Sequence, residues 1–228
     1  MSNWRLIIKV IGILLFIEAG LLLTCFIVGI IYNEPARYSF LWPMIIAWTI
    51  GFVNQYVGRN SALTMSRKDG YIIVSFIWVI YTLIGMLPFI FSGSVPDFAS
   101  AFFETMSGFT STGATIIDNC DIQPHCILFW RSITQWIGGI GIIFFTVALL
   151  PAFGVGEVKL FAAESTGPFR NKVHPRINVT AKWIGTVYLL LTGTCIISLY
   201  LCGTGLFDAV NYSMTICATG GYAPQSDL

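Results

Sequence analysis

Five apolar runs, each long enough to cross a lipid bilayer, constrain this sequence more than any other feature. A spanning helix needs about 20 apolar residues at ~1.5 Å per residue to match a hydrocarbon core of ~30 Å. Only 10% of the 228 residues are charged, against about 25% in soluble domains. We therefore predict an all-α integral membrane protein with spans at residues 6–32, 40–56, 71–91, 129–150 and 182–201. The first run lacks a small-residue cleavage site, so we expect a span and not a cleaved signal peptide.

Positive charges alternate from one connection to the next, which predicts the orientation of the chain. All but two of the twelve Lys and Arg residues lie near the amino terminus or in the second and fourth connections, and the exceptions are Arg37 and Arg131. Basic residues gather on the cytoplasmic side of membrane proteins. The amino terminus is therefore predicted to be cytoplasmic and the first and third connections to lie outside. Acidic residues favour the outer connections, where they either concentrate cations or only solvate the loops.

The third connection contains the segment VPDFASAFFETMSGFTSTGATIIDN, which is too short and too polar to cross the membrane. Its neighbours are antiparallel spans, so it either lies outside or dips into the membrane and returns. Pro96 and Asp97 predict the start of a short helix, with Asp97 as its cap. Gly108 is expected to end that helix. An uncharged, extended segment follows.

The same arrangement returns later in the chain, which predicts an internal repeat. In both copies a span leads to a short helix with an acidic residue, SVPDFASAFF and GLFDAVNYSM, and then to a turn, TSTGAT and CATGGYA. The predicted unit is a span, a re-entrant helix, a loop and a second span. The second copy reaches Leu228 before an outgoing span. When the sequence is compared with itself at an offset of 108 residues, Val79 aligns with Val187. At the same offset five more residues align with an identical residue of the second copy: Leu83, Gly85, Ala101, Met106 and Gly113.

The uncharged turns predict a cation pathway. Non-helical backbone at membrane depth is tolerated only where it is buried in protein or lines a water-filled cavity. Carbonyl oxygens can replace the hydration shell of potassium, and glycine adopts the positive φ that turns successive carbonyls toward one axis. The offset of the repeat selects Gly221 over Gly220 as the counterpart of Gly113. We expect filter residues at Ser111, Thr112, Gly113 and Ala114 in the first loop, and at Thr219, Gly220, Gly221 and Tyr222 in the second.

Two other functions remain open on these residues alone. The turns could bind another small solute at the end of a broken helix in a secondary transporter. Alternatively, they could be ordinary outer loops of a membrane scaffold that transports nothing. An enzyme is not expected, because the sequence has no phosphate-binding glycine loop, paired carboxylates or Ser/His/Asp arrangement. Neither a covalently bound cofactor nor a nucleic-acid partner is expected.

Four motifs in order resemble one transporter family. The segments FFETMSGFTSTGATII, RSITQWIGGIGIIFFTVALLP, KLFAAESTGPFRNKVHPRI and FDAVNYSMTICATGGYAP closely resemble the TrkH branch of the Trk/Ktr/HKT potassium-transporter superfamily. The resemblance implies four span–loop–span units around one pore, with Gly113 and Gly221 as the first two filter glycines. It implies passive or coupled (symport) potassium uptake. By this resemblance the chain looks like the amino-terminal half of such a transporter, either truncated or split.

The resemblance also implies partners and a location. The family forms homodimers and works with a cytoplasmic nucleotide-binding regulatory subunit of the TrkA type. We expect a multi-pass protein of the bacterial inner membrane, with its filter loops facing outside. The expected organisation is a transmembrane hairpin (1–60), a first pore unit (69–153), a cytoplasmic loop (154–180) and an incomplete second pore unit (181–228).

Three charged residues near or inside the spans are candidates for supporting roles. Glu104 is expected to brace the first filter loop from behind by accepting backbone or hydroxyl hydrogen bonds, without touching the ion. Glu18 is expected to form a hydrogen bond with a neighbouring helix, with proton coupling as the alternative. Arg131 is expected to extend outward to the membrane interface.

Other residues in the third connection and the fourth span carry weaker signals. The glycines of the segment 138–141 predict close approach of another helix, with a hinge as the alternative. Cys120 and Cys126 share one outer loop and could form a disulfide in an oxidising compartment. His125 lacks the spacing of a metal ligand and is expected to be an ordinary polar loop residue.

Overall fold

The computed structural model describes residues 3–61, 67–149 and 177–226, in which every regular element is a helix. The predicted all-α class is thereby confirmed. Most of the predicted cytoplasmic loop, 154–180, lies outside the described residues. The helices in chain order are α1 (Trp4–Ile31), the 3-10 helix η1 (Pro35–Phe40), α2 (Leu41–Gly58), α3 (Arg67–Gly85), α4 (Leu87–Ser92), α5 (Phe98–Phe109), α6 (His125–Leu149), α8 (Ile177–Leu201) and α9 (Leu206–Cys217).

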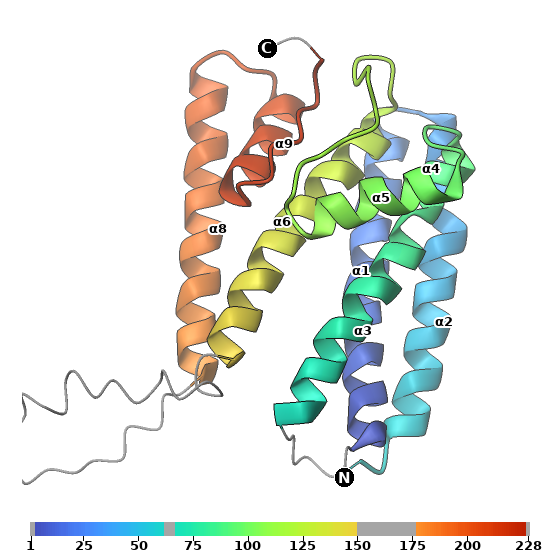
Figure 1. Ribbon diagram of the computed structural model, residues 1–228. Coiled ribbons are helices and arrows are strands. Elements are labelled where there is room, and N and C mark those ends of the chain that lie inside the picture. The colour runs from blue at the N-terminus through green and yellow to red at the C-terminus, as the bar shows by residue number, and fades with distance from the viewer. Residues whose placement is uncertain (1–2, 62–66, 150–176, 227–228) are drawn as a thin grey trace, which may run out of the picture.

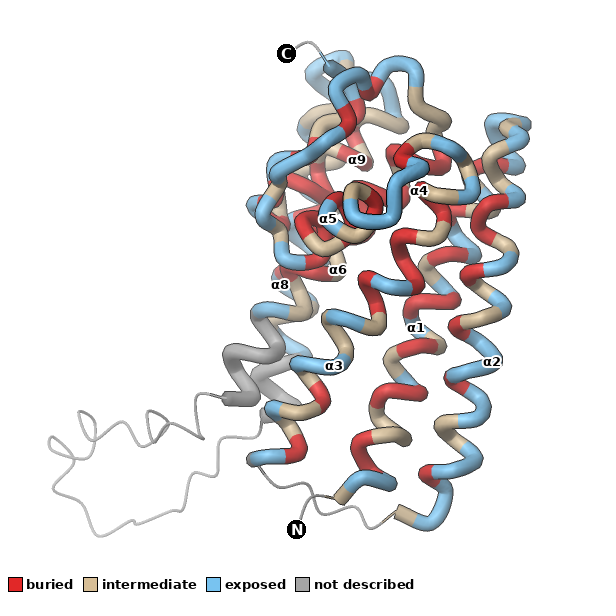
Figure 2. The backbone as a smooth tube through the Cα atoms, turned by 45° about the vertical axis from the view of Figure 1, so that its right-hand side comes forward, coloured by how far each residue is buried: buried red, intermediate tan, exposed pale blue. Residues whose placement is uncertain are grey.

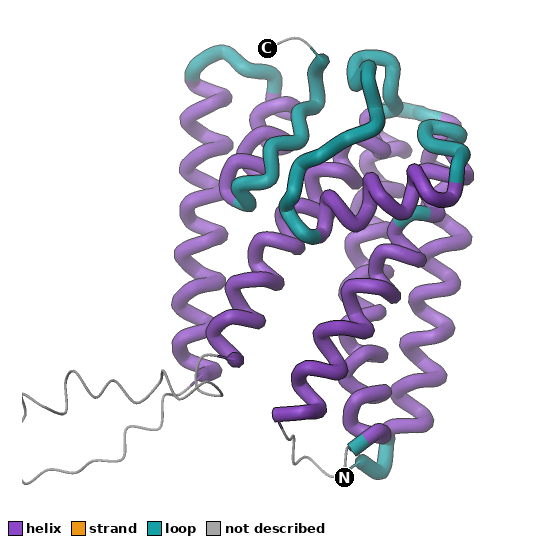
Figure 3. Tube along the Cα trace, viewed as in Figure 1, coloured by secondary structure: helices purple, strands orange, loops and turns teal. Residues whose placement is uncertain are grey.

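The long helices alternate in direction (Figure 1). α1, α3 and α8 lead away from the end of the molecule that holds the amino terminus, and α2 and α6 return toward it. Four described stretches are long and apolar enough to cross a membrane: Trp4–Ile31, Pro35–Gly58, Lys68–Ser92 and Lys182–Leu201. The remaining predicted span falls on α6, which begins earlier than expected, at His125. The short helices α5 and α9 lie toward the opposite end, and the loops after them turn back to that end (Figure 3).

The third predicted span is two helices and not one. α3 ends at Gly85 and α4 begins at Leu87, with Pro88 in its first turn. Proline has no backbone N–H and its ring clashes with the carbonyl of the fourth residue before it, so it kinks or breaks a helix, and here the break falls just before Pro88. The corresponding stretch of the second unit has no proline, and α8 continues without a break to Leu201.

α1 and α2 form the predicted amino-terminal hairpin, and small residues bring the two helices close together. A Cβ atom added to Gly12 would lie 2.8 Å from the Cβ of Asn54, and one added to Gly51 would lie 3.1 Å from the Gly12 carbonyl oxygen. Close backbone approach of this kind stabilises helix pairs in membranes through van der Waals contact. Nearby, the Gln55 side chain donates a 2.8 Å hydrogen bond to the Lys9 carbonyl.

The hydrogen bond predicted for Glu18 is absent. Glu18 is fully buried on α1, and neither carboxyl oxygen has a hydrogen-bond partner among the described residues. Tyr81 of α3 lies within electrostatic range of Glu18. Its hydroxyl group, however, donates to the backbone carbonyl of Leu14. The Tyr81 hydroxyl could have served Glu18 as a donor, but the Leu14 carbonyl, one helical turn earlier on α1, accepts its hydrogen bond instead.

Buried residues follow α1 over most of its length and gather again around α5 and the first half of α6, whereas much of α2 is exposed (Figure 2). Phe109 at the end of α5 and Trp130 of α6 are both fully buried and form an edge-to-face pair with ring centroids 6.2 Å apart. The Trp130 indole N–H donates to the carbonyl of Gly85 at the end of α3. The core of the first pore unit therefore lies directly behind the loop that follows α5.

Candidate functional site

The two short helices α5 and α9 begin differently but end in the same way. As predicted, Asp97 caps α5, and its Oδ2 accepts the Ser100 N–H at 2.9 Å. At the other end, the N–H of Thr112 donates to Ser107 O and the N–H of Ser111 donates to Gly108 O. The same pair of bonds recurs at the equivalent positions of the second copy, from Gly220 to Thr215 and from Thr219 to Ile216. This pattern is a Schellman motif, which satisfies the last carbonyls of a helix.

The prediction that Gly108 ends α5 was wrong. The helix continues to Phe109, and the residue in the left-handed conformation is Ser111, with φ 53°. Its counterpart Thr219 has φ 52°. Gly108 instead allows α6 to pack closely against α5, since a Cβ atom there would lie 2.3 Å from Oγ1 of Thr134 on α6. Non-glycine residues at positive φ carry strain, which tends to gather at functional sites.

Glycines with positive φ follow these turns at the two positions that the repeat predicts. Gly113 has φ 77° and Gly221 has φ 87°. The two loops meet here, because a Cβ atom on Gly113 would lie only 1.9 Å from the carbonyl oxygen of Gly220. Within the described residues, a Cβ atom on Gly221 would meet nothing within 4 Å. Gly113 is thus required for contact between the loops as well as for its own conformation.

Several carbonyl oxygens of the two loops are left without hydrogen bonds. Within the described residues, no donor reaches the carbonyl oxygens of residues 110–113 or 218–221. The carbonyl of Ala114 differs, since it accepts hydrogen bonds from Ser107 Oγ at 2.6 Å and from the Tyr222 hydroxyl at 3.4 Å. The oxygens of 110–113 and 218–221 are therefore available to a ligand, whereas that of Ala114 is engaged behind the first loop.

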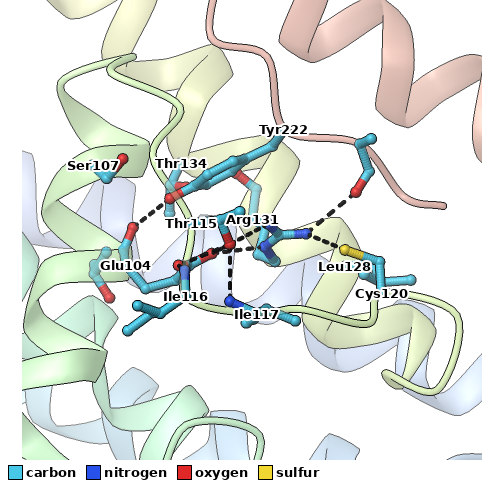
Figure 4. Close-up of polar contacts among 12 residues, drawn as sticks. Glu104, Ser107, Thr115, Ile116, Ile117, Cys120, Leu128, Arg131, Thr134 and Tyr222 are labelled. Carbon is cyan, nitrogen blue, oxygen red and sulfur yellow. Dashed lines mark hydrogen bonds and ion pairs between the residues drawn. The ribbon is translucent and has the colours of Figure 1, made fainter. Parts of the chain in front are cut away.

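Glu104 holds the first loop from behind (Figure 4). Its carboxylate accepts hydrogen bonds from the Thr115 hydroxyl, at 2.9 and 3.1 Å, and from the Ile116 N–H at 3.0 Å. Glu104 is fully buried. These are the acceptor contacts that the sequence predicted for this residue. They fix residues 115–116 against α5 by a charged acceptor, which makes stronger hydrogen bonds than a neutral one.

The prediction that Arg131 extends outward to the membrane interface was wrong. It is buried, with 2% exposure, and its Nε donates to Glu104 Oε1 at 2.9 Å. Its other donors reach the Thr115 hydroxyl, the Cys120 sulfur and the carbonyl of Ala223 in the second loop. A buried guanidinium needs a carboxylate and further acceptors to offset its desolvation; α5 provides the carboxylate and the two loops provide the other acceptors. Arg131 therefore joins the first loop to the second.

Tyr222 completes this connection from the second loop. Its ring lies 4.3 Å from the Arg131 guanidinium carbon, and its hydroxyl donates to the Glu104 carbonyl at 2.7 Å. The side chain therefore packs behind the first loop.

Gln135 lies one turn after Arg131 on α6 and contacts both loops. Its side-chain oxygen accepts the Tyr222 N–H at 3.1 Å, and its backbone carbonyl accepts the Ser111 hydroxyl at 3.4 Å. The next turn of α6 packs against the ends of both short helices. A Cβ on Gly138 would lie 2.0 Å from the Phe109 carbonyl oxygen, and one on Gly139 would lie 3.0 Å from Ala218 Cα. The predicted close approach is confirmed for these two glycines, whereas Gly141 makes only an ordinary contact, 3.8 Å from Trp78.

The roles of Arg131 and Gln135 were missed in the sequence, although a signal was present. The segment RSITQ places four polar residues in the first half of an otherwise apolar helix, and all four are buried. Polar residues at this density within a span indicate a face turned toward polar partners and not toward lipid. The identity of the partners depends on tertiary structure, because they come from two loops that belong to different copies of the repeat.

The structure also differs from the sequence analysis at Cys120, Cys126 and His125. Cys120 and Cys126 are both free and buried, and the Cys120 sulfur accepts from Arg131. His125 begins α6 and does not lie in a loop; its ring stacks on Tyr32 at 4.0 Å. In the described part of the chain, no cluster of three or more His, Cys, Asp or Glu residues could hold a metal ion. Any cation at this site would be held by backbone and hydroxyl oxygens.

Known proteins are similar to this chain in sequence and in fold. The family described as "TrkH: Cation transport protein" matches residues 37–227. The "Trk system potassium uptake protein TrkH" of Salmonella typhimurium is 38% identical over 224 residues, which cover 97% of this chain and 46% of that protein. The protein of the same name from Vibrio parahaemolyticus is 36% identical over 226 residues, with the same coverage. These relatives are transporters, and the chain spans about half their length.

A solved structure agrees with the fold described above. The crystal structure of the potassium transporter TrkH from Vibrio parahaemolyticus superposes with a TM-score of 0.84 and 32% sequence identity. The match covers 99% of this chain and 45% of that one. The hairpin and both loop-bearing units are therefore features shared with that transporter.

Proposed function

Because this chain belongs to the TrkH family of cation transport proteins, we propose that it forms part of a potassium-uptake pathway through a cell membrane. In this pathway the loops after α5 and α9 contribute backbone oxygens to a selectivity filter. The contact between Gly113 and the Gly220 carbonyl carries the proposal, since it brings two loops with the same unusual backbone to one place. The relatives named as potassium uptake proteins support potassium as the ion.

The chemistry of the loops suits a weakly hydrated monovalent cation. Carbonyl oxygens can replace the water around potassium, and those of residues 110–113 and 218–221 have no other partner in the described chain. No charged side chain occurs in these segments, so an ion is not held as tightly as by a ring of carboxylates. α5 and α9 turn their carboxyl ends, the negative ends of their dipoles, toward the loops. The same polarity disfavours the alternative of an anionic substrate.

The eight predicted filter residues divide into two roles in this proposal. Ser111, Thr112 and Gly113 line the pathway with free carbonyls, as do the corresponding residues of the second loop, 219–221. The Ala114 carbonyl and the Tyr222 side chain instead hold the first loop in place from behind. Glu104 supports the same loop and does not contact the ion.

The orientation and partners are part of the proposal. The start of α1, the end of α2 and the start of α3 lie at the end of the molecule that holds the amino terminus (Figure 1). These parts of the sequence carry Arg5, Lys9, Arg59 and Lys68. By the positive-inside rule this end is cytoplasmic and the two loops face outside. The names of the relatives include "Trk system". We extend this to a bacterial inner membrane location, a homodimer and a TrkA-type regulatory partner on the cytoplasmic side.

The filter is tested by Gly113→Ser in the native membrane protein, with uptake of potassium and sodium measured at matched protein amounts. The new Cβ would overlap the Gly220 carbonyl and force a non-glycine residue to φ 77°. Strain of about 1–3 kcal/mol that displaces filter oxygens should lower the potassium-to-sodium uptake ratio by roughly tenfold. Gly20→Ser is the matched control, because a Cβ on Gly20 meets no atom of the described residues within 4 Å. An unchanged ratio in Gly113→Ser would exclude the filter assignment.

A further inference from the structure

Gln135 is a polar side chain in a position that usually belongs to an apolar one. It lies on α6 with 0% of its surface exposed, between the carboxyl ends of α5 and α9. Burying an amide without full hydrogen bonding costs roughly 1–3 kcal/mol in proteins. A residue such as methionine would fill the same volume at no such cost, so the amide itself needs an explanation.

The amide lies directly against the second loop. Its oxygen accepts the Tyr222 N–H at 3.1 Å. A Cβ atom on Gly220 would lie 2.3 Å from both the Cδ and the Oε1 of Gln135. Only glycine permits this approach. The amide therefore fixes the backbone of residues 220–222 by one hydrogen bond and one steric contact.

The same amide also faces the first loop. The Gly220 carbonyl oxygen is pressed toward Gly113, and the Gln135 Nε2 lies 3.8 Å from the position of a Gly113 Cβ. The Gln135 backbone carbonyl accepts the Ser111 hydroxyl. Gln135 thus lies behind the point where the two loops meet and has a hydrogen bond to each: its side-chain oxygen binds the second loop and its backbone carbonyl binds the first.

One half of the amide has no partner. The Nε2 group is buried and makes no hydrogen bond within the described residues, which is rare enough for a buried donor to require a reason. An amide retained at this cost must serve through its acceptor half or through its shape. The acceptor half reaches only the second loop.

We propose that Gln135 is a positioning residue that sets the spacing between the two filter loops and thereby the preference for potassium over sodium. This inference rests on the proposed potassium pathway. By holding the Tyr222 N–H, Gln135 fixes the peptide that carries the Gly221 carbonyl, which directly follows the one whose Gly220 carbonyl lies against Gly113. Without the acceptor, residues 220–222 are free to shift, and the oxygens of the two loops no longer keep one separation. Discrimination between ions of different size is then reduced, whereas packing of α6 is retained.

Two variants of the native membrane protein test this role. Gln135→Met keeps the side-chain volume and removes the acceptor, and Gln135→Asn keeps the amide but withdraws it by one methylene group. We expect both to lower the potassium-to-sodium uptake ratio by roughly three- to tenfold, the effect of one lost neutral hydrogen bond on an equilibrium. Gln55→Met is the matched control, because it removes a hydrogen bond to the Lys9 carbonyl in the hairpin and should leave the ratio unchanged.

The uptake ratio and the thermal unfolding midpoint should be measured for all four proteins. A lower ratio in either Gln135 variant, with the Gln55→Met ratio equal to that of the unmodified protein, supports the positioning role. If the unmodified protein prefers potassium and both Gln135 variants retain the full preference, the inference is overturned while the proposed function stands. If the unmodified protein has no preference for potassium, the proposed function fails and the inference fails with it.

Discussion

At the scale of single residues, Arg131 has the largest effect on how the site is assembled. Its guanidinium is buried beside the Glu104 carboxylate and also binds groups of both loops. The interior of a membrane protein tolerates such a charge only where it is paired. The sequence predicted the acceptor role of Glu104, because a carboxylate inside a re-entrant helix has few other uses. It did not predict Arg131 as the partner, since an arginine near the end of a span is usually extended toward the interface.

The pairing of Glu104 and Arg131 predicts non-additive stability changes. Glu104→Gln or Arg131→Met alone leaves a buried charge without its partner and should cost about 3–5 kcal/mol of unfolding free energy. The double variant should cost clearly less than the sum of the two, because no uncompensated charge remains. Unfolding of the four proteins in detergent, followed as a double-mutant cycle, measures the coupling. Arg59→Met is the control, as the Arg59 side chain is exposed and its guanidinium lies over the Tyr56 ring, away from any carboxylate within salt-bridge distance in the described chain. Additive costs would show that the pair is not coupled.

At the scale of elements, the repeat explains why α5 and α9 have the same length and the same end. Both helices contain 12 residues, and the offset of the repeat aligns both their first and their last residues. The sequence therefore predicted both helices and the positive φ of Gly113 and Gly221. It misplaced the end of α5, because a glycine inside a helix looks the same in sequence whether it ends the helix or admits a neighbour. Thr134, which lies against Gly108, belongs to the next long helix and not to the local sequence.

α6 packs between the ends of α5 and α9. A glycine-to-alanine change inside this contact should therefore have the opposite effect to one at an open position on another helix. At Gly138 the new methyl group would lie 2.0 Å from the Phe109 carbonyl oxygen, so α6 must move away from α5. We expect Gly138→Ala to cost about 1–3 kcal/mol, as overpacking does. At Gly193 of α8, where a Cβ meets nothing within 4 Å among the described residues, alanine should stabilise by up to about 1 kcal/mol through helix propensity. Thermal unfolding midpoints compare the two, and equal shifts would contradict the packing.

At the scale of the whole molecule, the amino-terminal hairpin is attached to both loop-bearing units at the end opposite the amino terminus. Glu34, just after α1, accepts the N–H groups of His125 and Cys126 at the start of α6, at 2.8 and 3.1 Å. The His125 ring stacks on Tyr32 of the hairpin and meets the edge of Phe207 from α9, with centroids 4.8 Å apart. The sequence predicted the hairpin from its apolar runs. Its docking was not predictable, because each contact joins residues that are far apart in the sequence and carries no local pattern.

This attachment predicts a loss of stability in acid that depends on Glu34. Burial alone would raise the pKa of Glu34, but the hydrogen bonds from Cys126 and His125 outweigh it and the pKa is lowered from its usual value of 4.5. A carboxyl group with a lowered folded-state pKa stabilises the fold above its unfolded-state pKa, and this contribution is lost as pH falls through the folded-state value. A carboxylate at a partly buried helix amino terminus contributes up to about 2 kcal/mol.

The thermal unfolding midpoint should therefore fall below about pH 4.5 in the unmodified protein. Glu34→Gln lacks the charge at every pH, so its midpoint should be lower at neutral pH and fall less steeply in acid. Asp118→Asn serves as the control, because Asp118 is exposed and makes no hydrogen bond in the described chain, and its profile should follow that of the unmodified protein. If Glu34→Gln has the same acid profile as the unmodified protein, the attachment of the hairpin does not depend on this carboxylate. The aromatic contacts among Tyr32, His125 and Phe207 would then have to hold the hairpin by themselves.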